Sequence, residues 1–205
     1  MTLLTPEPFA SLTQPRGGLW LVRHGETEWS RDLRHTGRTD VALTECGRAQ
    51  ALALEPVLAA GHFDRVLRSP LRRAHETADL AGFGDALADA DLVEWDYGDF
   101  EGQTTAELAQ RLGAFDIWTA RVTGGEGLDQ VGMRADRVLA RLAASGGRCL
   151  VFSHGHLLRV LTARWLGLEP AAGRLFALDA GSISILAGEH GRPVIRAWNL
   201  PGIRT

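Results

Sequence analysis

The sequence predicts a three-layer α/β/α sandwich with a mostly parallel central sheet and a small helical lid. Strand-like and helix-like stretches alternate along most of the chain, which is the pattern of a sheet covered by helices on both faces. Two short apolar runs, residues 19–22 and 149–152, have the composition of buried strands. With 205 residues, the chain is sized for one domain. We expect an N-terminal arm over residues 1–18, a single domain over 19–205, and a lid segment at about 103–128.

The first half of the predicted domain contains two strands and two helices. The strands are expected at residues 19–22 and 64–68, and the helices at 45–56 and 70–81. Thr44 is a suitable N-cap for the first helix, which Pro56 should kink or end. Ser69 and Pro70 predict the N-cap and the first position of the second helix.

The second half begins with a loop at residues 94–102. Helices are expected at 104–112, 114–122, 128–144 and 155–166, and strands at 149–152, 182–186 and 193–198. The two apolar runs end in Arg23-His24 and Ser153-His154. Ligands of such sheets bind beyond the carboxyl ends of the strands, so these pairs should meet at one sheet edge if their strands are neighbours.

All 22 basic residues are arginine, and the chain has no lysine. This excludes a phosphate-binding loop of the G-x-x-x-x-G-K type and any lysine nucleophile or Schiff base. Arginine suits two-pronged recognition of phosphate or carboxylate, although a lysine-free chain can equally reflect a compositional bias of the genome.

The overall charge and the cysteine content restrict the partners and the location. A formal net charge of −3 and a pI of about 6.2 argue against nucleic-acid binding. Cys46 and Cys149 form no C-x-x-C motif, which indicates a reducing compartment rather than a disulfide framework or a zinc site. No apolar stretch approaches the roughly 20 residues of a membrane span. We therefore expect a cytoplasmic protein without nucleic-acid or membrane partners, and the oligomeric state is not predicted.

Histidines among arginines at the predicted strand ends favour phosphate chemistry. The fixed positive charge opposes a cationic metal and attracts a phosphate group, so no metal or cofactor is expected. A neutral imidazole such as His24 can attack phosphorus to give a phosphohistidine. Glu94 is the natural donor of the proton that the leaving oxygen needs, and it could later deprotonate the attacking water. Asp96, Asp99 and Glu101 lie close by in the sequence and are alternative acids.

Four segments resemble, in order, the motifs of the histidine phosphatase family, also called the phosphoglycerate mutase-like family. They are Leu21-Val22-Arg23-His24-Gly25-Glu26-Thr27, Ser69-Pro70-Leu71-Arg72-Arg73-Ala74-His75-Glu76-Thr77-Ala78, residues 94–102, and Ser153-His154-Gly155. The resemblance implies that His24 is the nucleophile and Glu94 the proton donor. It also implies phosphate contacts from Arg23, Arg73 and His154.

The resemblance also implies substrate-binding positions around the phosphate pocket. Thr36 and Gly37 match a family position whose hydroxyl and backbone line this pocket. Ser30 stands where the family more often has Asn, so its hydroxyl offers one donor in place of an amide. His156, on the helix after the last motif, could face the pocket or pack against the sheet. Gly127 stands where Ser is common, so a lid contact is expected to be missing there.

The family resemblance implies a metal-independent phosphomonoesterase that hydrolyses small phosphorylated metabolites, phosphosugars in particular, through a phosphohistidine. Residues 94–102 and 153–159 look most like the branch that holds acid phosphatases and sedoheptulose bisphosphatase. Phosphoryl transfer of the phosphoglycerate mutase type is the alternative activity. A non-catalytic module that binds phosphorylated metabolites is an alternative from a different class. Because hydrolysis needs a neutral His24 and a protonated Glu94 together, the rate should peak below neutrality.

Overall fold

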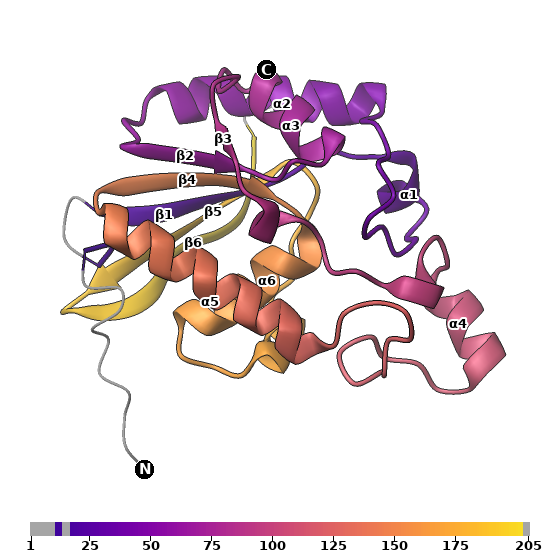
Figure 1. Cartoon of the computed structure of the whole chain (residues 1–205). Helices are drawn as coiled ribbons and strands as arrows, with labels where there is room; N and C mark the ends of the chain where they lie inside the picture. Colours follow the sequence, from indigo (N-terminus) through magenta and orange to yellow (C-terminus); the bar gives the residue numbers. More distant parts are fainter. Residues whose placement is uncertain (1–10, 14–16, 203–205) are drawn as a thin grey trace, which may run out of the picture.

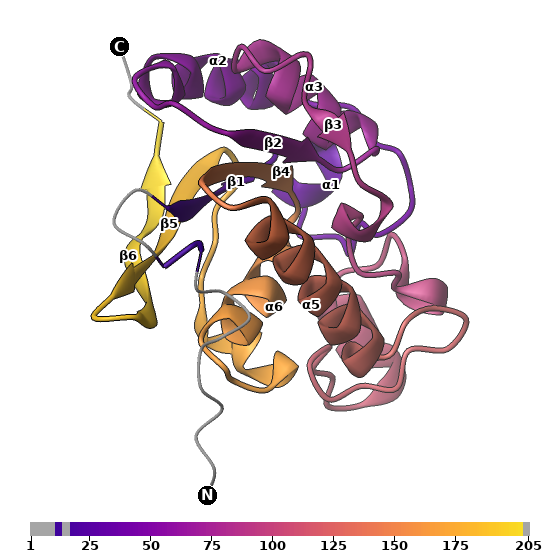
Figure 2. The ribbon, with the colours of Figure 1, turned by 60° about the vertical axis from the view of Figure 1, so that its left-hand side comes forward.

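A mixed sheet of six strands lies between two layers of helices (Figures 1 and 2). The computed structural model describes residues 11–13 and 17–202. The strands are β1 (Gly18–Arg23), β2 (Arg65–Arg68), β3 (Leu87–Ala88), β4 (Arg148–Ser153), β5 (Ser182–Glu189) and β6 (Arg192–Pro201). Their order is β3-β2-β4-β1-β5-β6; the first four are parallel, and β5 and β6 each run antiparallel to their preceding neighbour in this order.

The helices divide between the two faces of the sheet, which confirms the predicted three-layer sandwich. Figures 1 and 2 show α2 (Glu45–Ala59) and α3 (Arg72–Leu80) on one face, and α5 (Leu128–Ser145) and α6 (Gly155–Trp165) on the other. Two shorter helices, α1 (Glu28–Arg31) and α4 (Thr105–Leu112), lie beyond the carboxyl ends of the parallel strands. Short 3₁₀ helices occur at Ala90–Leu92, Gly98–Phe100 and Pro170–Leu175.

Both faces of the central strands are buried, as their continuous apolar sequences predict. On β1, Leu19 and Leu21 belong to the core cluster under α5 and α6, whereas Val22 belongs to the cluster under α2 and α3. On β4, Val151 and Phe152 divide between the same two clusters. Alternation along each strand therefore anchors both helical layers to the same two strands.

The register of β1 and β4 sets the position of the polar pairs that follow them. Arg23 is paired with Ser153, and the N–H of His24 donates to the carbonyl of Ser153 (2.9 Å). The N–H of Ser69, directly after β2, donates to the carbonyl of Phe152 (2.9 Å). The expectation that the polar pairs meet at one sheet edge is confirmed.

The close approach of α2 to the chain after β1 requires glycine. A Cβ atom at Gly47 would overlap the carbonyl oxygen of Glu26, and one at Gly25 would overlap the carbonyl oxygen of Gly47. Gly47→Ala is expected to lower the free energy of unfolding by about 1–3 kcal/mol, because backbone atoms must move apart to admit the methyl group. Urea denaturation measures this, with Leu52→Ala on the exposed side of α2 as a control that changes stability by no more than about 0.5 kcal/mol. Unchanged stability of Gly47→Ala would contradict the close packing.

Two predicted helix boundaries are wrong. Pro56 neither ends nor interrupts α2, because it lies on the exposed side, where water can solvate the carbonyl that loses its N–H partner. Ala51 and Leu58 on either side of it are buried and hold the helix in place. The next helix begins at Arg72 rather than Pro70, and Leu71 is its N-cap.

The helix predicted at residues 114–122 is also absent from the structure, which has turns there. The side chain of Asp116 accepts a hydrogen bond from the N–H of Trp118 (3.0 Å), a local bond that competes with helix formation. Gly113, with φ of +86°, ends α4 before this segment. The segment 103–128, expected to be a lid, therefore contains one regular helix, α4.

The division into an arm over 1–18 and one domain over 19–205 stays a prediction. Residues 1–10, 14–16 and 203–205 lie outside the described part of the chain. Leu12 is fully buried in the core cluster under α5 and α6, and Gly18 is already the first residue of β1. Ser11 donates to the carbonyl of Ala143 on α5. These residues of the predicted arm pack on the fold.

Candidate active site

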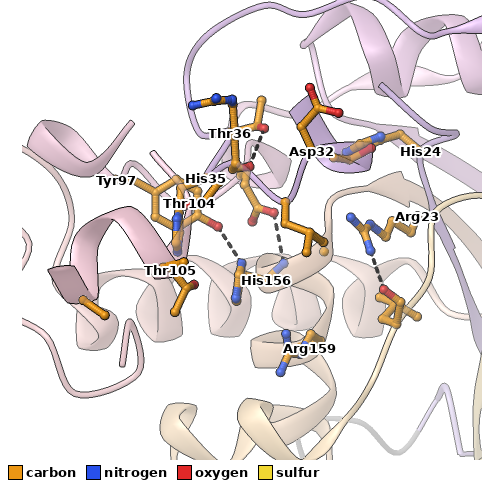
Figure 3. Close-up of a pocket in the computed structure, with 18 residues that line it drawn as sticks. Arg23, His24, Asp32, His35, Thr36, Tyr97, Thr104, Thr105, His156 and Arg159 are labelled. Carbon is orange, nitrogen blue, oxygen red and sulfur yellow. Dashed lines mark hydrogen bonds between the residues drawn. The ribbon is translucent and has the colours of Figure 1, made fainter. Parts of the chain in front are cut away.

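The carboxyl ends of β1 and β4 border a cavity of about 710 Å³ (Figure 3). Its walls come from the end of β1, the segment around α1, the loop before α4, α4 itself and the first turns of α6. The predicted site residues that line it are Arg23, His24, Ser30, Thr36, Glu94 and His156. Three further predicted site residues, Arg73, Gly37 and His154, do not line it.

His24 presents one ring nitrogen as a nucleophile. Its Nδ1 lies 2.7 Å from the carbonyl oxygen of Gly25. Because a carbonyl can only accept, Nδ1 carries the proton and Nε2 carries the lone pair of the neutral ring. Burial, with the positive charges of Arg73 and Arg23, lowers the pKa of His24 well below its usual value. The imidazole is therefore neutral at neutral and mildly acidic pH.

Arg23 offers an unused hydrogen-bond donor beside His24. Its side chain is half-buried on the cavity wall, and Nη1 donates to the carbonyl of Leu178. Within the described residues, Nε of Arg23 is buried and has no hydrogen-bond partner. A Cβ atom at Gly155 would lie 3.3 Å from the guanidinium carbon, so glycine at the start of α6 leaves room for this side chain. A buried donor without a partner is costly, which favours an anionic acceptor in the cavity.

Arg73 and His154 form a buried pair behind His24. Nε of Arg73 donates to Nδ1 of His154 (3.1 Å), and Nε2 of His154 therefore carries the proton and donates to Oγ of Ser69 (2.7 Å). The rings of His154 and His24 are 5.1 Å apart between centroids. Burial and the charge of Arg73 lower the pKa of His154 well below its usual value. Both side chains are fully buried, so in this arrangement Arg73 acts on His24 through its charge.

Glu94 reaches the same cavity from the loop that follows the 3₁₀ helix Ala90–Leu92. Its carboxylate lies at the N-terminus of α6, where Oε2 accepts from the N–H of His156 (3.0 Å) and Oε1 from that of Leu157 (2.8 Å). The N–H of Trp95 also donates to Oε1 (2.9 Å). Only 5% of Glu94 is exposed, and it is on the cavity wall with His24. A carboxyl fixed beside the predicted nucleophile is suited to acid–base chemistry.

None of the three alternative acids lines the cavity, and two of them have other partners. The carboxylate of Glu101 accepts from the backbone N–H groups of Gly37 and Thr39. Asp96 accepts from the N–H of Gly98 and pairs with Arg38 at 3.3 Å. Among the candidate acids, the geometry therefore favours Glu94.

A family model described as the histidine phosphatase superfamily, branch 1, matches residues 19–201. The chain belongs to this family. It is 40% identical over 188 residues to an acid phosphatase of Mycobacterium tuberculosis, an alignment that covers 90% of this chain and 93% of the relative. It is also 35% identical over 181 residues to sedoheptulose 1,7-bisphosphatase of Saccharomyces cerevisiae, covering 72% of this chain and 67% of the relative.

A solved structure supports the same relationship. The product of a Mycobacterium tuberculosis open reading frame superposes with a TM-score of 0.87 at 39% identity, over 91% of this chain and 98% of that one. The expected family, and the branch with acid phosphatases and sedoheptulose bisphosphatase, are confirmed. As a histidine phosphatase of this branch, the chain is an enzyme of the phosphoric monoester hydrolase class.

Ser30 and Thr36 line the cavity of this histidine phosphatase but already have backbone partners. Oγ of Ser30 accepts from the N–H of Thr27 (2.9 Å) and donates to the carbonyl of Thr27 (3.0 Å), which caps α1. Oγ1 of Thr36 donates to the carbonyl of Arg34 (3.0 Å). Gly127, where a lid contact was expected to be missing, is the N-cap residue of α5. The substrate-binding roles of Ser30 and Thr36 stay predictions.

Gly37 and His156 differ in their relation to the cavity. The N–H of Gly37 donates to the carboxylate of Glu101 (2.9 Å) rather than toward the cavity. His156 lines the cavity, and Figure 3 shows its ring beside Tyr97. Burial raises the pKa of Tyr97 well above its usual value, so its hydroxyl keeps the proton, and this hydroxyl is hydrogen-bonded to Nδ1 of His156 (2.6 Å). Of the two alternatives left open for His156, the structure favours the one facing the cavity.

Ser69 and Thr77 are parts of the site that the sequence does not indicate. The sequence predicts Ser69 as a helix cap, but its Oγ is the partner of His154. Its position directly after β2, equivalent to that of His24 after β1, was the available signal. Thr77 lies one helical turn after Arg73 on the same face, and its Oγ1 accepts from the N–H of Gly25 (3.1 Å). Both residues fix groups that border the predicted nucleophile.

The buried neutral histidines make the stability dependent on pH. The pKa values of His24 and His154 are lowered in the folded protein, so below about pH 6.5 the unfolded chain binds more protons. Each of the two then removes up to about 1.4 kcal/mol of stability for each pH unit below 6.5. Urea denaturation should give a lower free energy of unfolding at pH 5.5 than at pH 7.5. Equal or greater stability at pH 5.5 would contradict the neutral state of these two rings.

Proposed function

We propose that this histidine phosphatase hydrolyses phosphomonoesters of small metabolites through a phosphohistidine at His24, without a metal ion. One observation carries the proposal. Three residues line one cavity: a neutral His24 whose Nε2 carries the lone pair, Arg23 with an unpartnered Nε donor, and Glu94. This arrangement supplies a nucleophile, a phosphate ligand and a proton donor together.

In the first step, Nε2 of His24 attacks phosphorus and the ester P–O bond breaks. The protonated carboxyl of Glu94 gives its proton to the departing oxygen, which leaves as an alcohol. The imidazole that has accepted the phosphoryl group carries a positive charge, and its Nδ1–H donates to the carbonyl of Gly25, which stabilises that charge. Arg23 binds the phosphoryl oxygens, and Arg73 adds positive charge from behind the ring.

In the second step, a water molecule attacks the phosphohistidine. The carboxylate of Glu94 takes a proton from the water, the P–N bond breaks, and inorganic phosphate forms. Nε2 of His24 regains its lone pair, and Glu94 is again protonated for the next cycle. The inorganic phosphate then dissociates from the site into solvent.

The charge of the site supports the proposed metal independence. Arg23 and Arg73 supply the positive charge that a metal ion supplies in other phosphatases, and they would repel a divalent cation. Among residues 11–13 and 17–202, no group of three or more His, Cys, Asp or Glu side chains is placed to hold a metal. Turnover of p-nitrophenyl phosphate should therefore persist in excess EDTA. Activity that disappears with EDTA and returns with a divalent metal would overturn this part of the proposal.

Phosphosugars are the proposed substrates, and the size of the cavity supports small metabolites. About 710 Å³ lies within the roughly 300–1,000 Å³ usual for small-molecule sites. The resemblance to sedoheptulose 1,7-bisphosphatase favours sugar phosphates over other esters. A screen of phosphorylated metabolites for released phosphate would test this choice, and preference for non-sugar phosphates would contradict it.

The alternatives are phosphoglycerate mutase-type transfer and non-catalytic binding. Incubation with 3-phosphoglycerate, with and without its bisphosphate primer, separates transfer from hydrolysis. We expect phosphate release to exceed isomerisation, whereas primer-dependent isomerisation that outruns release would favour a mutase. Complete inactivity of the pure protein toward p-nitrophenyl phosphate between about pH 4 and 8 would favour the binding module.

A cytoplasmic location is part of the proposal. Cys46 and Cys149 are both free, which supports a reducing compartment. Separately, no helix in the described part of the chain has both the length and the apolar character needed to cross a bilayer.

A further inference from the structure

Arg134, a buried arginine of α5 that does not line the cavity, uses all its hydrogen-bond donors on the backbone from Asp91 to Glu94 and on the carboxylate of Glu126. Nη1 donates to the carbonyls of Asp91 (2.8 Å) and Val93 (2.7 Å), and Nη2 donates to the carbonyl of Glu94 (3.2 Å). Nε and Nη2 also donate to the two carboxylate oxygens of Glu126, each at 2.7 Å. A guanidinium has five N–H donors, and all five are used here.

Glu126 extends this contact to the residues that follow Glu94. Its Oε2 accepts from the N–H of Asp96 (3.0 Å), and its own N–H donates to the carbonyl of Asp96 (2.9 Å). Its carbonyl accepts from Nε1 of Trp95 (2.8 Å). Burial opposes ionisation of Glu126, but the hydrogen bonds and charge of Arg134 outweigh this and lower its pKa. The ionised pair of Arg134 and Glu126 therefore binds the backbone on both sides of Glu94.

The carboxylate of Glu94 is held from the opposite side by α6. The backbone N–H groups of His156 and Leu157 fix its two oxygens, while Arg134 fixes its backbone carbonyl. The position of the carboxyl in the cavity thus depends on two elements at once. If Arg134 released the backbone carbonyl of Glu94, the carboxylate would keep its partners on α6, but the backbone that positions it in the cavity would no longer be fixed.

We propose that Arg134 is a positioning residue for proton transfer by Glu94: it sets the distance between the carboxyl and the leaving oxygen of the substrate. The inference rests on the proposed role of Glu94 as the proton donor. Proton transfer needs the two heavy atoms within about 2.6–3.2 Å, and a misplacement of about 1 Å can cost as much as 100-fold in rate. A change at Arg134 should therefore slow the esters that need a proton on the leaving group and spare those that do not.

Arg134→Lys is the test variant, because lysine keeps the positive charge beside Glu126 but cannot supply five donors in a fixed plane. We compare kcat/KM for phenyl phosphate, a poor leaving group, with that for 2,4-dinitrophenyl phosphate, which leaves without a proton. We expect a loss of about 10-fold or more with the phenyl ester and of less than about 2-fold with the dinitrophenyl ester. A purely structural role would lower both values by the same factor.

Arg137→Lys is the matched control on the same helix. Arg137 pairs with Asp91 through an exposed side chain and, among the described residues, makes no hydrogen bond to the carbonyls around Glu94, so both esters should keep their wild-type rates. Should Arg134→Lys fail to fold, Glu126→Gln decides the question. Glutamine keeps the shape of Glu126 but binds Arg134 more weakly because it has no charge. This variant should also lose more activity with phenyl phosphate than with 2,4-dinitrophenyl phosphate.

Glu94→Gln, measured with the same two esters, separates failure of this inference from failure of the proposed function. If Glu94→Gln slows only the phenyl ester while Arg134→Lys slows both equally or neither, Arg134 has no positioning role and the proposed acid stands. If Glu94→Gln itself affects both esters alike, the proposed proton donor is wrong, and the inference falls with it. If both variants slow the phenyl ester selectively, both proposals are supported.

Discussion

His24→Ala is expected to lower kcat/KM for p-nitrophenyl phosphate by about 10⁴-fold or more. The variant keeps Arg23, the proposed phosphate ligand, and the charge of Arg73, but it loses the nitrogen proposed to attack phosphorus. Removal of the nucleophile of a covalent mechanism eliminates the route itself, and only weak assistance to direct attack by water remains. Steady-state kinetics measure the loss, with circular dichroism to establish that the variant is folded.

A second histidine variant provides the control for this loss. His62 is exposed over 89% of its side chain, pairs with Asp64 at 3.7 Å and does not line the cavity. His62→Ala should keep the wild-type kcat/KM. A His24→Ala enzyme that retained more than about a tenth of the wild-type activity would show that another group attacks the phosphorus.

Glu94→Gln is expected to lower kcat/KM for phenyl phosphate by about 10²–10⁴-fold, the usual contribution of a positioned general acid. The same variant should lose no more than a few-fold with 2,4-dinitrophenyl phosphate, whose phenolate leaves without a proton. Glutamine is close in shape and keeps one oxygen to accept from the N–H groups of His156 or Leu157, but it has no proton to give.

The matched control for Glu94→Gln is an acid from the same loop that does not line the cavity. Asp99→Asn removes such a carboxylate, and both esters should keep their wild-type rates. Equal losses of Glu94→Gln with the two esters would point to a different acid, and a selective loss in Asp99→Asn would identify it.

The central part of the fold could be predicted from the sequence because its signals are strong and local. The runs at 19–22 and 149–152 are apolar on both faces, and only a strand between two helical layers buries both. Weaker local signals failed where tertiary contacts decide the outcome. Pro56 is tolerated because neighbouring residues on the other side of α2 are buried and hold the helix. The sequence alone does not show this burial. Asp116 forms a turn in a segment whose composition is compatible with a helix.

The sequence predicts which residues make up the candidate site, but it does not predict which of their side chains face the cavity and which are buried behind it. Arg23 and His24 directly follow a predicted strand, so their place on the cavity could be expected from the sheet topology, whereas Glu94 lies in a predicted loop and its role was implied by its chemistry and by the family motif. The side-chain directions of Arg73 and His154 could not, because the sequence does not show that these two side chains pair with each other behind His24. The contact of Arg134 with the chain around Glu94 could not be predicted either. Most of its partners are backbone carbonyls, which every residue type has.

The most direct measurement of the central claim is the identity of the phosphorylated residue during turnover. Glu94→Gln is mixed with 2,4-dinitrophenyl phosphate, which can phosphorylate the enzyme without a proton donor, whereas cleavage of the phosphoenzyme by water lacks its base. The reaction is quenched in alkali, which preserves a phosphohistidine, and peptides are analysed by mass spectrometry. We expect one acid-labile phosphoryl group on the peptide that contains His24. A phosphoryl group on another residue, or an unmodified chain throughout turnover, would contradict it.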